Sequence, residues 1–222
     1  METPIIILNM KTYPESTGKA GMKLAAICQE VFEETGKPLA IAPQNCDLAL
    51  FANTFGLPVF GQHVDNVKQG GTTGRITPEA IKAIGCAGTL INHSEHRIPA
   101  GDVEALVSRC RELGLTTIVC TKDPEESQAY SRFKPDFIAV EPPELIGGDV
   151  SVTTANPKVV SDSVKLVKEA APGVKVLCGA GVKNGKDVAK AIELGADGVL
   201  LASGVVKAKD PRAVLLDLAG GL

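Results

Sequence analysis

Eight short runs of aliphatic residues recur along the chain, and longer segments with helical spacing separate them. The runs are too short for helices and too apolar for strands with one face in water, which is typical of parallel strands buried on both faces. We predict such strands at Ile5–Asn9, Leu39–Ala42, Val59–Gln62, Thr89–Asn92, Thr116–Thr121, Phe137–Glu141, Val174–Gly179 and Gly198–Leu201.

The intervening segments place apolar residues at i, i+3, i+4 and i+7, the spacing of a helix that buries one face. Several begin with an N-cap residue followed by proline, a pairing that starts helices. We predict helices over Thr17–Glu34, from Thr77 onward, and over Asp102–Leu113, Asn156–Ala170, Asn184–Leu194 and from Asp210 onward. Gly85, Gly114 and Gly195 should end three of them in the left-handed conformation.

Strands that alternate with helices form a parallel sheet, and eight such units favour an α/β fold of the closed (β/α)8 barrel type. The alternative is an open doubly wound sheet, which would carry a glycine-rich phosphate fingerprint after its first strand. Here the first run continues into Met10-Lys11 without a glycine. No linker or shift in composition divides the chain, so we predict a single domain over residues 1–222.

The charge and hydropathy of the chain exclude several classes of partner. The formal net charge is −3, so a basic face for nucleic acid is not expected. No stretch approaches the roughly 20 apolar residues of a membrane span. The first apolar run follows Glu2 rather than a basic segment, so we expect no signal peptide and a cytoplasmic location.

The six cysteines lie far apart and form no Cys-x-x-Cys pair. We expect free, buried thiols in a reducing compartment rather than disulfides or a zinc site. His93 and His96 form a His-x-x-His pair, but no further ligands cluster around them in the sequence. We therefore expect no metal site.

Polar residues follow three of the predicted strands, at the end of a barrel where active sites lie. Asn9 and Lys11 follow the first strand, His93 follows the fourth, and Glu141 ends the sixth. One cation, one imidazole and one carboxylate that converge in this way suit proton transfer next to an anion.

Each of these residues also has a plainer interpretation. Glu141 could be a surface carboxylate, but it directly follows a buried run and precedes two prolines. Lys11 could be a solvated lysine. His93 could be a core histidine, but we predict that it begins a short helix closed by Pro99, whose N-terminal partial charge would keep the imidazole neutral. We expect His96 and Arg97 to be structural.

Two loops of small residues are candidates for binding a phosphate group. Gly179-Ala180-Gly181 and Ala202-Ser203-Gly204 follow the seventh and eighth strands, the usual phosphate cradle of this architecture. Small side chains let backbone N–H groups approach a dianion, although either loop alone could be a tight turn. Residues 142–150, with two prolines, apolar Leu145 and Ile146 and two glycines, are typical of a lid that excludes water.

The ordered set of motifs resembles the triosephosphate isomerase family over nearly the whole chain. The resemblance lies in Asn9-x-Lys11, His93-Ser94-Glu95-x-Arg97, Val140-Glu141-Pro142 followed by Ile146-Gly147, and the two phosphate loops. Residues 62–65 and 70–74 resemble the family's third loop, which reaches into the neighbouring subunit. The short chain, the absence of Trp and the lid sequence Pro143-Glu144-Leu145 resemble the compact archaeal branch, whose members are typically tetramers.

The resemblance implies interconversion of dihydroxyacetone phosphate and glyceraldehyde 3-phosphate through an enediolate, in glycolysis and gluconeogenesis. It implies that Glu141 is the base, that neutral His93 polarises the carbonyl, and that Lys11, held by Glu95, stabilises negative charge. Substrate binding is implied for Asn9, Lys11, Ile146, Gly181, Ala202 and Ser203. The resemblance also implies that no metal or organic cofactor is used and that the chain forms a homotetramer, with a homodimer as the alternative.

Two other functions remain open at this point. One is a different phosphate-binding barrel enzyme, such as a metal-dependent sugar-phosphate epimerase or a Schiff-base lyase. The epimerase would need His and Asp ligands at several strand ends, and the lyase would need a lysine inside the barrel. The other is a barrel that serves only in binding or assembly, which the joint presence of Lys11, His93 and Glu141 disfavours.

Overall fold

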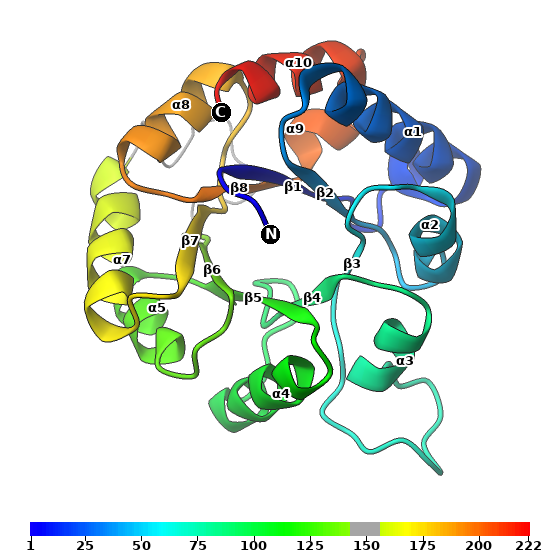
Figure 1. Ribbon diagram of the computed structural model, residues 1–222, viewed down its shortest axis with the longest axis vertical. Helices are drawn as coiled ribbons and strands as arrows, with labels where there is room; N and C mark the ends of the chain where they lie inside the picture. Colours follow the sequence, from blue (N-terminus) through cyan, green and yellow to red (C-terminus); the bar gives the residue numbers. More distant parts are fainter. Residues whose placement is uncertain (143–155) are drawn as a thin grey trace.

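In the computed structural model, which describes residues 1–142 and 156–222, parallel strands form a ring that helices surround (Figure 1). Around the ring the strands follow the order β2-β1-β8-β7-β6-β5-β4-β3. They are β1 (Ile5–Asn9), β2 (Leu39–Ala42), β3 (Phe60–Gly61), β4 (Gly88–Ile91), β5 (Thr116–Thr121), β6 (Phe137–Val140), β7 (Lys175–Cys178) and β8 (Gly198–Leu201). The predicted (β/α)8 barrel is confirmed.

The predicted helices are present with small changes at their ends. They are α1 (Gly18–Thr35), α3 (Pro78–Ala83), α4 (Ala100–Glu112), α7 (Pro157–Ala170), α8 (Gly185–Glu193) and α10 (Pro211–Gly220). The side chains of Thr77, Asn184 and Asp210 accept backbone hydrogen bonds as N-caps. Within residues 1–142 and 156–222, four further elements were not predicted, namely the 3-10 helix η1 (Pro14–Ser16), α2 (Leu48–Thr54), α5 (Pro124–Ser131) and α9 (Ser203–Val206).

The barrel closes at a narrow seam between β2 and β3. There the two strands share one isolated parallel bridge, Ile41 to Val59, and the Ile41 N–H donates to the Pro58 carbonyl at 3.1 Å. The third strand is two residues long, shorter than the predicted Val59–Gln62. The other neighbouring strands pair in parallel, over four residue pairs in most cases, two between β3 and β4, and one, Cys178 to Val199, between β7 and β8.

Alternate residues along the strands enter two separate cores. In β1, Ile5 and Ile7 face the barrel interior while Ile6 and Leu8 pack against the helices, as the period of two of a strand requires. The interior is filled by Ile5, Ile7, Ala40, Ala42, Phe60, Leu90, Ile118, Cys120, Phe137, Ala139, Leu177 and Leu200. Burial on both faces explains why the strands are mostly apolar.

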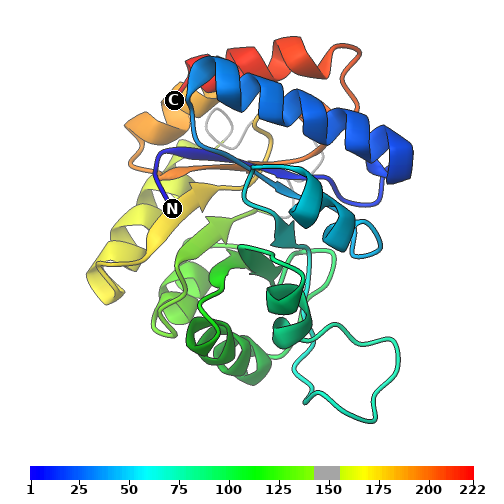
Figure 2. The ribbon, with the colours of Figure 1, turned by 45° about the vertical axis from the view of Figure 1, so that its right-hand side comes forward.

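The segment between β3 and α3 is a long loop that extends away from the barrel (Figures 1 and 2). Residues 68–75 of this loop are all exposed. Its base is closed by Asp65, whose carboxylate accepts the Ile76 N–H at 2.7 Å and pairs with Arg75 at 2.9 Å. The loop is therefore anchored at its base while its tip is exposed.

All six cysteines are free, as predicted, and five are buried. Cys46 is the exception, because it lies exposed in the loop between β2 and α2. Within the described residues, no helix has the length and apolar character needed to cross a membrane.

Candidate active site

The strand register brings the predicted polar side chains to one mouth of the barrel. Asn9 lies two residues after Ile7, and Glu141 lies two residues after Ala139, so both continue an inward-facing series. A cavity at this mouth is lined by Asn9, Lys11, Tyr13, His93, Glu141, Gly179, Ala180, Gly181, Val182, Lys183, Leu200, Leu201, Ala202, Ser203 and Gly204. All predicted site residues that the structure describes line this cavity, except Glu95.

Lys11 is held in place by its neighbours on both the backbone and the side chain. Its φ of 48° lies in the left-handed region, which costs a residue with a side chain about 1–2 kcal/mol. The Lys11 N–H donates to Asn9 Oδ1 at 3.0 Å, and Lys11 Nζ pairs with Glu95 Oε1 at 2.9 Å. The ion pair between Lys11 and Glu95 that the resemblance implied is therefore present, and it leaves the Lys11 ammonium at the cavity wall.

The hydrogen bond at His93 Nδ1 determines which ring nitrogen carries a proton. The Glu95 N–H donates to His93 Nδ1 at 3.2 Å, so Nδ1 is an acceptor and the proton of a neutral ring lies on Nε2. His93 is buried and lines the cavity. The predicted short helix is wrong, because residues 93–96 form only one hydrogen-bonded turn. The tautomer of the neutral ring is thus set by one backbone N–H rather than by a helix end.

Glu141 is buried at 4% exposure, with its carboxylate at the floor of the cavity. Its Oε1 lies 3.5 Å from His93 Nε2, close enough for both groups to contact one small substrate. Among the described residues, Glu141 Oε2 has no hydrogen-bond partner. A buried carboxylate oxygen without a donor is costly for stability, and it is well placed to accept a proton from a ligand.

Gly179 packs directly against Glu141. A Cβ at residue 179 would lie 2.4 Å from Glu141 Cγ and 3.0 Å from the Val140 carbonyl oxygen. Glycine is therefore required here to make room for the carboxylate, in addition to the predicted role of this loop in binding phosphate. Sequence reasoning placed Gly179 in a phosphate loop and missed this contact, which only the packing reveals.

The two predicted phosphate loops lie side by side at the cavity. A Cβ at Gly204 would lie 3.3 Å from the Val182 carbonyl oxygen, so the loop after β8 approaches the loop after β7. Gly181 has a φ of 70°, which glycine adopts readily. Ser203 begins the four-residue helix α9, which was predicted only as a loop. Ile146 and all of the predicted lid at residues 142–150 except Pro142 lie outside the described residues.

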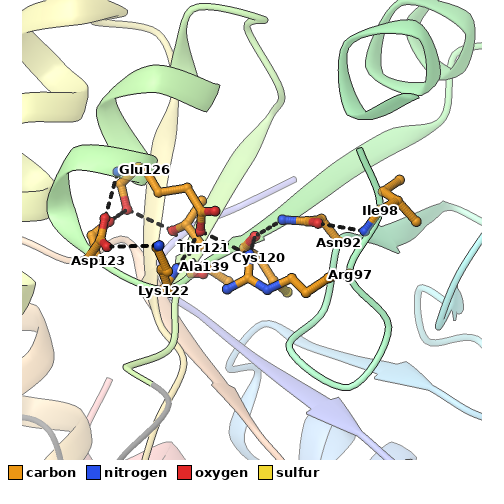
Figure 3. Close-up of polar contacts among 10 residues, drawn as sticks. Asn92, Arg97, Ile98, Cys120, Thr121, Lys122, Asp123, Glu126 and Ala139 are labelled. Carbon is orange, nitrogen blue, oxygen red and sulfur yellow. Dashed lines mark hydrogen bonds and ion pairs between the residues drawn. The ribbon is translucent and has the colours of Figure 1, made fainter. Parts of the chain in front are cut away.

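A polar network holds the turn that carries His93 against β5 (Figure 3). Asn92 has a φ of 62°, its Nδ2 donates to the Cys120 carbonyl at 3.0 Å, and its Oδ1 accepts the Ile98 N–H at 3.1 Å. Arg97 also donates to the Cys120 carbonyl, at 3.4 Å, and pairs with Glu126 at 2.9 Å. The network agrees with the predicted structural role of Arg97.

Asn92 supports the site from the end of the fourth predicted strand, and sequence reasoning assigned it no role there. The signal available in the sequence was an asparagine directly before His93, since asparagine tolerates the left-handed conformation better than most residues.

His63 and His96 stack beside the site, with ring centroids 3.8 Å apart. His63 Nε2 also lies 3.6 Å from Asp65 Oδ1. Burial is the largest cause that lowers the pKa of His63, and the charge of His96 lowers that pKa further. Both rings line a second cavity next to Lys11 and Glu95. Among the described residues, no group of three or more His, Cys, Asp or Glu side chains could hold a metal ion.

A family model and curated relatives both match this chain over nearly its whole length. Residues 4–219 match the family model described as triosephosphate isomerase. The chain is 51% identical over 214 residues to a triosephosphate isomerase of Methanocaldococcus jannaschii, covering 96% of this chain and 98% of that protein. It is 50% identical over 217 residues to the one of Methanothermobacter thermautotrophicus, covering 98% of this chain and 95% of that protein.

Proposed function

The chain belongs to the triosephosphate isomerase family, and from this premise we propose that Glu141, His93 and Lys11 carry out the isomerisation at the mouth of the barrel. The reaction interconverts D-glyceraldehyde 3-phosphate and dihydroxyacetone phosphate through an enediolate. The single observation that carries the assignment is the 3.5 Å approach of Glu141 Oε1 to His93 Nε2, with Glu141 Oε2 unpartnered among the described residues.

Glu141 acts as the base in this proposal. Its carboxylate removes a proton from the carbon next to the substrate carbonyl, and the electron pair of the broken C–H bond forms the enediolate. The same carboxyl group then returns the proton to the adjacent carbon, so no net proton is gained or lost. Gly179 leaves the room that the Glu141 side chain occupies, so the carboxylate can lie at the cavity where a general base must meet its substrate.

His93 acts as the electrophile. Because Nδ1 accepts the Glu95 N–H, the Nε2–H is available to donate to the substrate carbonyl oxygen as negative charge develops there. A neutral ring can also pass this proton between the two oxygens of the enediolate. A carboxylate base beside a neutral histidine is the arrangement already established for this family.

Lys11 supplies positive charge for an anionic intermediate and for the phosphate group. Asn9 holds the Lys11 backbone, and Glu95 holds its ammonium group. We propose that Gly181, Ala202 and Ser203 bind the phosphate through backbone groups, because they line the same cavity. The proposed contact from Ile146 lies outside the described residues.

The reaction as proposed needs no cofactor, because the proton moves between two carbons through protein groups alone. A metal-dependent epimerase would require a ligand cluster, and the described residues contain none that could hold a metal ion. We therefore expect full activity in the presence of a chelator. Loss of activity with the chelator, and recovery on adding a divalent metal, would contradict this proposal.

The test is a coupled assay that converts glyceraldehyde 3-phosphate to dihydroxyacetone phosphate, run beside Glu141→Ala. We expect the variant to lose about 10²–10⁴-fold or more in kcat, the range that a positioned general base supplies. Glu104→Ala, which removes an exposed carboxylate on α4, is the matched control and should keep wild-type turnover. A Glu141→Ala variant with near wild-type turnover would refute the assignment of the base.

We further propose that residues 1–222 form one domain that assembles into a homotetramer, with a homodimer as the alternative. The exposed loop at residues 68–75 offers a surface for a second copy, and the tetramer rests on the resemblance to the archaeal branch. Light scattering that finds an active monomer at micromolar concentration would contradict both. A cytoplasmic location is proposed from the family's place in glycolysis and gluconeogenesis.

A further inference from the structure

Gln62 occupies an unusual place at the seam of the barrel. It directly follows β3, where β2 and β3 share a single isolated bridge. Its Nε2 donates to the Ala42 carbonyl at 2.9 Å and to the Lys11 carbonyl at 3.0 Å. One side-chain amide therefore joins the ends of β2 and β3 to the residue that carries the site's cation.

The orientation of the Gln62 amide follows from these two partners. Both are carbonyl oxygens, so both need donors, and the two hydrogens of Nε2 supply them. The opposite orientation would place Gln62 Oε1 against two acceptors. Both hydrogens of the Gln62 amide are thus used in these two hydrogen bonds.

The Lys11 backbone needs such support. At φ 48° it has a conformation that residues with a side chain adopt only when their surroundings impose it. The N–H of Lys11 is held by Asn9 and its C=O by Gln62, so two side chains fix the two polar groups of one residue. The side chain that leaves this backbone then reaches Glu95 and the cavity.

We propose that Gln62 is a positioning residue for the reaction, acting through Lys11 rather than by touching substrate. Gln62 lines the second cavity, beside Lys11, and not the cavity that contains Glu141 and the phosphate loops. Loss of its hydrogen bond releases the Lys11 carbonyl, and the ammonium leaves the position it needs. The proposal rests on the proposed role of Lys11.

A purely structural role is the competing explanation, because Gln62 also closes the seam through Ala42. The two explanations differ in one measurable way. If Gln62 acts through Lys11, its replacement has no further effect on kcat/KM once the Lys11 ammonium is gone. If it only stabilises the barrel, its effect on kcat/KM is the same with or without that ammonium.

The experiment is a double-mutant cycle with Gln62→Met, Lys11→Met and the double variant, followed by NMR so that slow variants stay measurable. Methionine keeps the length of the side chain and removes both donors. We expect Gln62→Met to lower kcat/KM about 10–100-fold, since small misplacements of a reacting group have large effects. The double variant should match Lys11→Met within about twofold.

Asn53 provides a matched control, because its Nδ2 also donates to two carbonyls, those of Ala49 and Ile84, far from the mouth. Asn53→Leu should lower the melting temperature without changing kcat/KM. Additive effects of Gln62→Met and Lys11→Met would overturn the proposal. If Gln62→Met does not fold, Gln62→Asn, which is too short to reach both carbonyls, enters the same cycle. An inactive wild-type chain would refute the proposed function instead, before the cycle begins.

Discussion

Replacing Gly179 by alanine should slow the reaction strongly while leaving the barrel folded. The new Cβ would lie 2.4 Å from Glu141 Cγ and 3.0 Å from the Val140 carbonyl oxygen. Glu141 is buried, so its side chain can relieve the contact only by moving into the cavity that it lines. The single added carbon therefore acts on the proposed base directly.

The size of the effect follows from these distances. Carbon atoms in contact normally lie about 3.5–4.0 Å apart, so Glu141 Cγ must move by about 1 Å. A misplacement of about 1 Å can cost about 10²-fold in rate, or about 2.7 kcal/mol in the barrier. Overpacking lowers stability by about 1–3 kcal/mol, which is less than the total of about 5–15 kcal/mol that a domain has.

The assay compares kcat with the free energy of unfolding measured in urea. Gly173→Ala is the control, because Gly173 precedes the same strand, β7, and a Cβ there would meet nothing within 4 Å. We expect Gly173→Ala to behave as wild type and Gly179→Ala to lose about 10²-fold in kcat. A folded Gly179→Ala variant with kcat within threefold of wild type would refute the reasoning from packing.

Three further predictions concern thiol reactivity, pH and backbone strain. Burial raises the pKa of buried thiols, that of Cys28 to about 12, so a thiol reagent should label the native chain once, at the exposed Cys46. Cys46→Ser should abolish this labelling. Several equivalents of label on the folded chain would contradict the prediction. Burial lowers the pKa of His63 below 6.5 in the folded chain, so the unfolded chain binds a proton at His63 more strongly than the folded chain does. The free energy of unfolding should therefore fall as the pH drops below about 6.5. His63→Asn should flatten that slope in urea titrations, and an unchanged slope would show that other groups cause it. Glycine at residue 92 adopts the left-handed conformation readily, whereas alanine is strained there, so Asn92→Ala should be less stable than Asn92→Gly by about 1–2 kcal/mol. Equal free energies of unfolding for the two variants would show that the φ of residue 92 costs nothing.

Several elements could be predicted because their signals are local. Thr77-Pro78 and Asp210-Pro211 mark the starts of α3 and α10, where Thr77 and Asp210 cap the helices as expected. Asp123-Pro124 carries the same signal, and Asp123 caps α5, so this helix could have been predicted as well. The 3-10 helix and α2 are short and bury few side chains, so their periodicity is too weak to read.

The third strand shows where local signals fail. Its apolar residues predicted a strand over Val59–Gln62, yet only Phe60 and Gly61 have strand geometry. The reason is its position at the seam, where the ladder between β2 and β3 is reduced to one bridge. Gln62 lies beyond the strand and uses its side chain there instead.

The sequence by itself determined the eight buried strands, most of the helices between them, and the polar residues Asn9 and Glu141 at the strand ends. It could do so because the period of a strand and the demand for apolar burial act on neighbours along the chain. Only the tertiary structure decided the tautomer of His93, the 3.5 Å approach of its Nε2 to Glu141, and the fit of Gly179 against that carboxylate. These depend on atoms that different strands bring together when the barrel closes, and closure is a property of the whole ring.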